Sequence, residues 1–207
     1  EYYEENESNI KNLIIFPKKS GLKGYKDIND FAGTYPFVDY QFNMLQRMLN
    51  GIRTNGTAGK DISKGERSLL EAYQNAAINF MREEIGTVIP LYGFYGVVEN
   101  YLNPSIKEVI VEAEKNKAIS EFALKVLKTL FLIKYENTLE ADGDNIASLM
   151  ISNLRDSKKE VQEKTKDALA SLVEEGFVEK SGKGYVFLTK EEQLINKEIS
   201  EISVEKE

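Results

Sequence analysis

The residue types that carry most chemistry at neutral pH are missing from this chain. Its 207 residues include no histidine and no cysteine. This excludes the usual general base at neutral pH, the Ser-His and Cys-His nucleophile pairs, disulfides and thiolate metal sites. The groups that remain for binding or catalysis are arginines, lysines, carboxylates and one glycine-rich segment.

That glycine-rich segment is Gly56-Thr57-Ala58-Gly59-Lys60-Asp61, which superficially resembles a phosphate-binding loop. Such a loop needs Gly-x4-Gly-Lys-Ser/Thr between a strand and a helix. Here Thr54 stands at the first position and Asp61 at the last, and helical patterns flank both sides. We interpret the segment as an interhelical loop. No other segment matches a Walker A motif, and no apolar strand ends in an acidic pair. We therefore expect no catalysis and no cofactor in this chain alone.

Lysines near the C-terminal end are candidates for contacts with DNA phosphates. They are Lys158, Lys159, Lys164, Lys180 and Lys183. Acidic residues at 160, 163, 167, 174 and 175 nearly cancel their charge, and no arginine is present there to contact guanine. The net charge of the whole chain is -7. We expect DNA contact to be weak if it occurs, and a structural or protein-contact role stays open for this region.

The elements that must position these residues differ between the two halves. Residues 1–30 are expected to be a partly irregular segment, in which the apolar run Leu13–Phe16 favours a short buried strand. Residues 31–117 predict a helical domain. Its helices are expected from about Val38 to Ile52, from Ser63 to Met81 and from Pro104 to Asn116, with an irregular aromatic connector around residues 89–102.

Residues 118–207 show a different order of elements. Helices are expected at 120–135, around 146–150 and from Ser157 to Val173. Two short strands follow, Phe177–Lys180 and Tyr185–Leu188, joined by a glycine-rich turn. Helices followed by a two-stranded wing predict a winged helix. Thr189 is expected to cap a last helix that ends near residue 203. The predicted fold is therefore mainly α.

Three motifs carry a resemblance to a known family. They are Tyr35-Pro36-Phe37-Val38-Asp39-Tyr40-Gln41-Phe42, Gly65-Glu66-Arg67-Ser68-Leu69-Leu70 and Phe187-Leu188-Thr189-Lys190-Glu191-Glu192-Gln193. Together they resemble the BREX phage-defence P-loop ATPase family of BrxC/PglY type, whose motifs are close to YPFVPYQF, GERSMLDAFQ and FLTNEEQ. The resemblance runs from about Asp27 to about Ile199. It implies that this chain corresponds to the part of such an ATPase that follows the P-loop core, and the absence of an initial Met fits an excised segment.

The resemblance also implies roles for two residues. In many AAA+ ATPases an arginine near the start of a lid-domain helix reaches the γ-phosphate, and Arg67 resembles that sensor. A surface pair between Arg67 and Glu71, four residues apart, is the other interpretation. Pro36 lies in a segment that packs near the adenine in AAA+ relatives. Its other interpretation is a rigid apolar entry to the following helix.

The family implies an expected setting for the chain. We expect a helical AAA+ lid-like domain followed by a winged helix, in the order of the ORC/STAND side of that class. The full-length parent would hydrolyse ATP with Mg²⁺ in the bacterial or archaeal cytoplasm, together with its P-loop core and other BREX proteins. No run approaches the roughly 20 apolar residues that span a bilayer, so no membrane partner is expected. A free-standing winged-helix transcription regulator and a pure protein-interaction module remain the alternatives.

Overall fold

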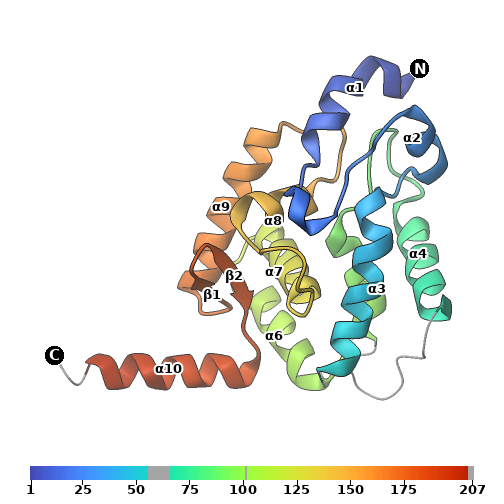
Figure 1. Cartoon of the computed structure of the whole chain (residues 1–207). Coiled ribbons are helices and arrows are strands. Elements are labelled where there is room, and N and C mark those ends of the chain that lie inside the picture. The colour runs from blue at the N-terminus through green and yellow to red at the C-terminus, as the bar shows by residue number, and fades with distance from the viewer. Residues whose placement is uncertain (56–65, 101, 205–207) are drawn as a thin grey trace.

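The computed structural model describes the backbone of residues 1–55, 66–100 and 102–204, and their side chains except those of 66–67 and 200–204. Within these residues the protein is mainly α-helical, with ten α-helices and one antiparallel hairpin (Figure 1). This confirms the expected class of secondary structure. The helices are α1 Tyr2–Leu13, α2 Ile28–Thr34, α3 Asp39–Thr54, α4 Glu66–Phe80, α5 Tyr95–Glu99, α6 Pro104–Lys115, α7 Glu121–Ile133, α8 Gly143–Met150, α9 Lys158–Glu174 and α10 Lys190–Val204. Two 3-10 helices, η1 Lys18–Ser20 and η2 Leu91–Phe94, and the strands β1 Val178–Ser181 and β2 Gly184–Phe187 complete the order.

The N-terminal segment differs from the expectation. The strand predicted at residues 13–16 is wrong, because α1 extends to Leu13 and no strand pairs with the extended residues that follow. Helix α1 buries Tyr3, Ile10 and Leu13, whose spacing of seven and three residues places them on one helical face. The amide of Asn9 donates to the Leu154 carbonyl at 2.7 Å. Contact with a distant segment therefore stabilises a helix whose local sequence is largely polar.

The C-terminal half follows the predicted order of helices and strands. Helix α7 lies centrally and packs against α8, α9, α6 and β2. Ser120 caps α7 by accepting a hydrogen bond from the Ala123 amide at 3.0 Å, and Ser157 caps α9 as expected. The hairpin pairs Val178 with Phe187, and its two-residue turn places Gly182 at a φ of 60°, which favours glycine.

Packing crosses the expected boundary near residue 117. The buried apolar residues form one cluster that extends from Tyr3 in α1 to Phe187 in β2. Backbone hydrogen bonds join the halves, with the Val88 amide donating to Ser152 at 2.9 Å and the Leu154 amide donating to Gly86 at 2.7 Å. The two halves are therefore packed together through a shared core.

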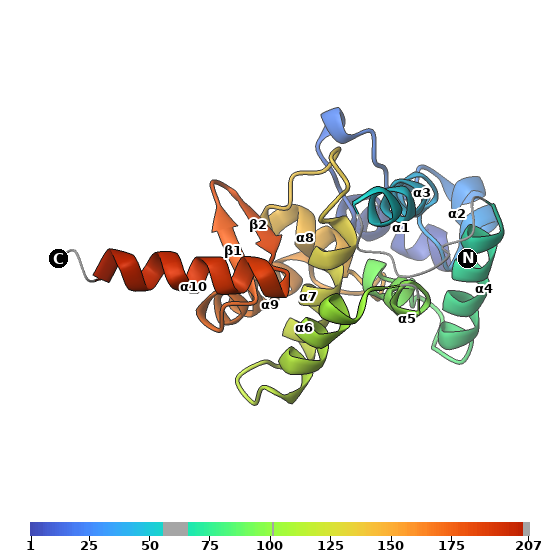
Figure 2. The ribbon, with the colours of Figure 1, turned by 90° about the horizontal axis from the view of Figure 1, so that it is seen from below.

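Two helices lie at opposite ends of the molecule. Helix α4 forms one edge, and α10 projects from the other with its C-terminal end pointing away from the body (Figures 1 and 2). Helix α10 is fixed at its base. Lys134, at the C-terminal cap of α7, donates to the Phe187 carbonyl at 2.7 Å and to the Glu192 carboxylate at 2.6 Å. Lys190 also pairs with Glu112 of α6.

Candidate functional site

The first candidate site is the junction between the start of α3 and helix α4. Pro36 lies just before α3, and its carbonyl accepts a hydrogen bond from the Ile89 amide at 3.0 Å. Gln41, fully buried in the first turn of α3, donates to the Ile89 carbonyl at 2.5 Å. The hydroxyl of Tyr35 accepts from the Gly86 amide at 3.0 Å. These bonds hold the segment around Pro36 against residues 86–89.

Aromatic packing joins this segment to α4. The rings of Phe37 and Tyr73 meet edge to face with centroids 5.0 Å apart, and Tyr73 meets Phe94 in the same way at 5.6 Å. Aromatic pairs in this geometry add stabilisation beyond the area that they bury. The motif at residues 35–42 therefore lies beside the helix that contains the motif at 65–70. The third motif lies apart from them, with Phe187 packed on Phe131 at 5.3 Å.

Arg67 is placed only by its backbone. Helix α4 begins at Glu66, so Arg67 lies in its first turn, as predicted. Its side chain lies outside the described part of the chain, and so does Ser63, the expected start of the helix. The glycine-rich segment Gly56–Asp61 also lies outside the described residues. The interpretations of Arg67 as a phosphate sensor and as the partner of Glu71 therefore stay predictions.

The outer face of α4 is apolar and exposed. Leu70 is 68% exposed, Ile78 54% and Met81, next to the end of the helix, 71%. These residues follow Arg67 by 3, 11 and 14 positions, which at 3.6 residues per turn puts all four on one side of the helix. The opposite side buries Ala72 and Ala76 completely. Helix α4 thus presents three large apolar side chains outward, with exposed Gln74 among them.

The second candidate site consists of the lysines on α9 and the hairpin. Lys158 lies at the start of α9, where its ammonium donates to the Asn12 carbonyl at 3.4 Å, and Lys159 lies 3.9 Å from Glu163. Lys164 is exposed on the same helix, and Lys180 and Lys183 are exposed on the hairpin. Carboxylates at 160, 163 and 167 are exposed among them. The structure therefore interleaves the two signs of charge, as the sequence suggested.

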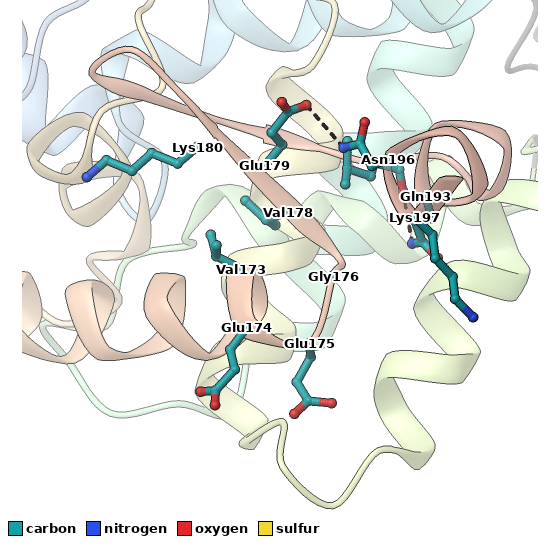
Figure 3. Close-up of a pocket in the computed structure, with 11 residues that line it drawn as sticks. Val173, Glu174, Glu175, Gly176, Val178, Glu179, Lys180, Gln193, Asn196 and Lys197 are labelled. Atoms are coloured by element: carbon teal, nitrogen blue, oxygen red, sulfur yellow. Dashed lines mark hydrogen bonds between the residues drawn. The ribbon is translucent and has the colours of Figure 1, made fainter. Parts of the chain in front are cut away.

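A hollow of about 640 Å³ opens between the hairpin, the end of α9 and helix α10 (Figure 3). Its lining includes the apolar side chains of Val173, Val178 and Leu188. Three carboxylates and two ammonium groups border it, from Glu174, Glu175, Glu179, Lys180 and Lys197. This excess of negative charge disfavours phosphate. The sequence does not reveal this hollow, because one of its walls is α10, whose position against the hairpin depends on tertiary contacts.

Contacts within the hollow fix α10 against the hairpin. The amide of Asn196 donates to the Glu179 carboxylate at 3.3 Å, and the amide of Gln193 donates to the Leu188 carbonyl at 3.3 Å (Figure 3). The side of α10 that faces the hairpin is therefore polar.

Comparison with known proteins gives no family. No protein-family model matches the chain, and no solved structure matches it. Among the helices that the structure describes, none is long and apolar enough to cross a membrane. Over the same described residues, no group of three or more carboxylates is arranged to hold a metal ion.

Proposed function

We propose that this chain is the lid and winged-helix part of a BREX-type anti-phage ATPase, following its P-loop core. The motif resemblance supports the family. The observation that carries the proposal is the outer face of α4, where exposed Leu70, Ile78 and Met81 continue the register of Arg67. Three exposed apolar side chains in one strip indicate a surface that another protein unit covers. In this proposal that unit is the P-loop core.

The residues then take the following roles. ATP and Mg²⁺ are held by the P-loop core, and Arg67 reaches the γ-phosphate from the start of α4, where arginine suits an oxyanion. Pro36 directs the chain into α3, and the hydrogen bonds around it hold the junction rigid. Movement of the α4 face relative to the core would couple nucleotide state to assembly with other BREX proteins in the cytoplasm.

The second half is proposed to be a winged helix formed by α7, α8, α9 and the β1–β2 hairpin. The order and capping of these elements support this assignment. Its interleaved charges and the acidic hollow favour contact with protein, or weak contact with DNA through Lys158, Lys159, Lys164, Lys180 and Lys183. A free-standing DNA-binding regulator is the alternative function, and it requires a basic face that α9 does not present over its described length.

The test is the affinity between this chain and the separately produced P-loop core of the full-length ATPase. Ile78→Asp combined with Met81→Asp should weaken the complex at least tenfold, because two charges would be buried against an apolar partner. Val186→Asp, an exposed apolar position on the hairpin at 37% exposure, serves as the matched control. The proposal is contradicted if wild type, the Ile78→Asp/Met81→Asp variant and Val186→Asp bind the core with equal affinity. It is also contradicted if the natural full-length protein contains no P-loop core.

A further inference from the structure

Helix α10 shows an inverted amphipathic pattern. The residues that face the body are polar, namely Glu192, Gln193 and Asn196, and each is only partly exposed. The apolar residues Leu194 and Ile195 are turned outward instead, with 57% and 54% of their surface exposed. A surface helix normally buries its apolar side. The outward side of α10 thus exposes two large apolar side chains beside the exposed carboxylates of Glu191 and Glu198, a combination that suits a partner surface with apolar and basic groups.

The base of α10 is held firmly enough to present that side to a partner. The hydroxyl of Thr189 accepts from the Glu192 amide at 3.3 Å, and the Glu192 carboxylate accepts from the Thr189 amide at 2.7 Å. This reciprocal capping box and the buried ammonium of Lys134 fix the direction of the helix. Ordering a surface before binding lowers the entropic cost of association.

A surface of complementary chemistry lies elsewhere on the same chain. A hollow of about 380 Å³ is formed by the segment between α1 and α2. Ile15, 47% exposed, and the largely buried Leu22 and Tyr25 supply apolar lining. The segment is held in place by the Tyr25 hydroxyl, which donates to the Phe37 carbonyl at 2.7 Å. At Gly24 a Cβ would approach the Ile14 carbonyl oxygen to 2.6 Å, so the close approach of the two chain segments requires glycine there.

The border of this hollow is basic. Lys18, Lys23 and Lys26 line it, and within the described part of the chain none of the three forms an ion pair. The charges of Lys26 and Lys23 are partly offset by the nearby carboxylates of Asp27 and Asp39, which lie outside the lining. Asp27 accepts from the Asn29 and Asp30 amides at the start of α2, and Asp30 accepts from the Lys26 amide at 2.9 Å. The hollow therefore combines an apolar lining with three lysines, and no carboxylate belongs to its lining.

We propose that α10 of one molecule docks into the residue 14–26 hollow of a second copy. Leu194 and Ile195 would cover the apolar lining around Ile15. Glu191 and Glu198, exposed on the outward side of α10, would lie opposite the lysines of the border. Neither glutamate forms an ion pair with a described residue. The charges of the two surfaces are opposite, as complementary interfaces require.

Pairing of α10 with α10 fits the charges less well. Between residues 190 and 201 the helix contains two lysines and four glutamates. Two such helices side by side would bring like charges together, whereas the basic hollow neutralises them. Because the donor and acceptor surfaces differ, the contact is head to tail. It closes into a ring, of which a reciprocal pair is the smallest, or builds open chains.

The experiment is sedimentation velocity of the full chain from micromolar to millimolar concentration, at low and high salt. Wild type should associate with increasing concentration, and less so at high salt. Ile195→Asp removes the donor surface, and Lys23→Glu combined with Lys26→Glu removes the acceptor surface. Each variant alone should be monomeric. Lys117→Glu, a charge reversal at an exposed lysine between α6 and α7, should associate like wild type, and thermal melts should show that all variants are folded.

A mixture of the donor variant Ile195→Asp and the acceptor variant Lys23→Glu/Lys26→Glu tests the contact most directly. The lysine variant still has an intact α10, and the Ile195→Asp variant still has an intact hollow, so one contact survives between them. The mixture should form a heterodimer and nothing larger. A wild-type chain that stays monomeric at every concentration overturns the proposal. The proposal also fails if the Lys23→Glu/Lys26→Glu variant still associates by itself and the mixture forms no heterodimer. That pattern requires a different contact.

Discussion

The Glu136 carboxylate is the charged group most completely enclosed by its partners. Its side chain is fully buried, and it accepts hydrogen bonds from the Thr138 amide at 3.1 Å, the Leu139 amide at 3.0 Å and Arg47 of α3 at 3.3 Å. Sequence could not identify this role, because Arg47 is 89 residues away. The caps at Ser120, Ser157 and Thr189 were predictable, since each bonds within three residues of itself.

Replacement of Glu136 should be costly. Glu136→Ala leaves the amides of Thr138 and Leu139 without their acceptor and removes the carboxylate that pairs with Arg47, so we expect a loss of about 2–4 kcal/mol in the free energy of unfolding. Glu140→Ala is the control, because Glu140 is 46% exposed and lies 3.8 Å from Lys19. That change should cost less than about 0.5 kcal/mol. Urea denaturation measures both, and equal losses would contradict the assigned role of Glu136.

Among the elements, helical periodicity predicted α3, α6, α7 and α9, and turn chemistry predicted the hairpin. Helix α1 was missed because its three buried residues are widely spaced among acidic and polar ones, and its partner Leu154 is remote in sequence. Helix α2 is short and buries no residue fully. The direction of α10 could not be predicted either, since it depends on Lys134 at the C-terminal cap of α7.

The base of α10 should respond to acid. Burial opposes ionisation of Glu192, but hydrogen bonds from Lys134 and the Thr189 amide outweigh it and lower the pKa of this carboxyl. A lowered pKa stabilises the fold above the unfolded value of about 4.3, and that contribution is lost as pH falls through the folded pKa. Thermal melts should show Glu192→Gln less stable than wild type near neutral pH. The difference should vanish in strong acid. A difference that does not shrink as the pH falls below the unfolded value of about 4.3 contradicts this.

The charge pattern of α9 and the hairpin predicts weak binding to duplex DNA without sequence preference. Affinity for DNA comes largely from neutralised phosphates, and here carboxylates stand among the lysines. Fluorescence anisotropy at two salt concentrations, on random and defined duplexes, measures it. Lys159→Glu with Lys164→Glu should remove any binding that is present. Nanomolar, sequence-selective binding at physiological salt would favour the regulator function instead.

At the scale of the whole molecule, the fold packs the motif at residues 35–42 against α4, the helix that contains most of the second motif. Phe37 contacts Tyr73, which lies three residues beyond that second motif. The motifs are visible in the sequence, but the packing of the first motif against α4 is not. Sequence reasoning also missed the outward apolar faces of α4 and α10, because periodicity identifies an apolar stripe without saying what covers it.

The isolated chain should not bind nucleotide tightly. Its sequence has no Walker A motif, and the proposal assigns ATP and Mg²⁺ to the P-loop core. Calorimetric titration with Mg-ATP should give a dissociation constant weaker than about 10 μM, which corresponds to roughly -7 kcal/mol. Tighter binding would show a nucleotide site within this chain.

The most direct test of the central claim is the ATPase rate of the full-length protein with Arg67→Ala. Loss of a phosphate contact should lower turnover by about 10- to 1,000-fold, while the melting temperature of this chain with the same change stays constant. Arg82→Ala, just past the other end of α4, is the matched control and should keep the wild-type rate. A full rate with Arg67→Ala would contradict the sensor role and leave Arg67 as a surface residue.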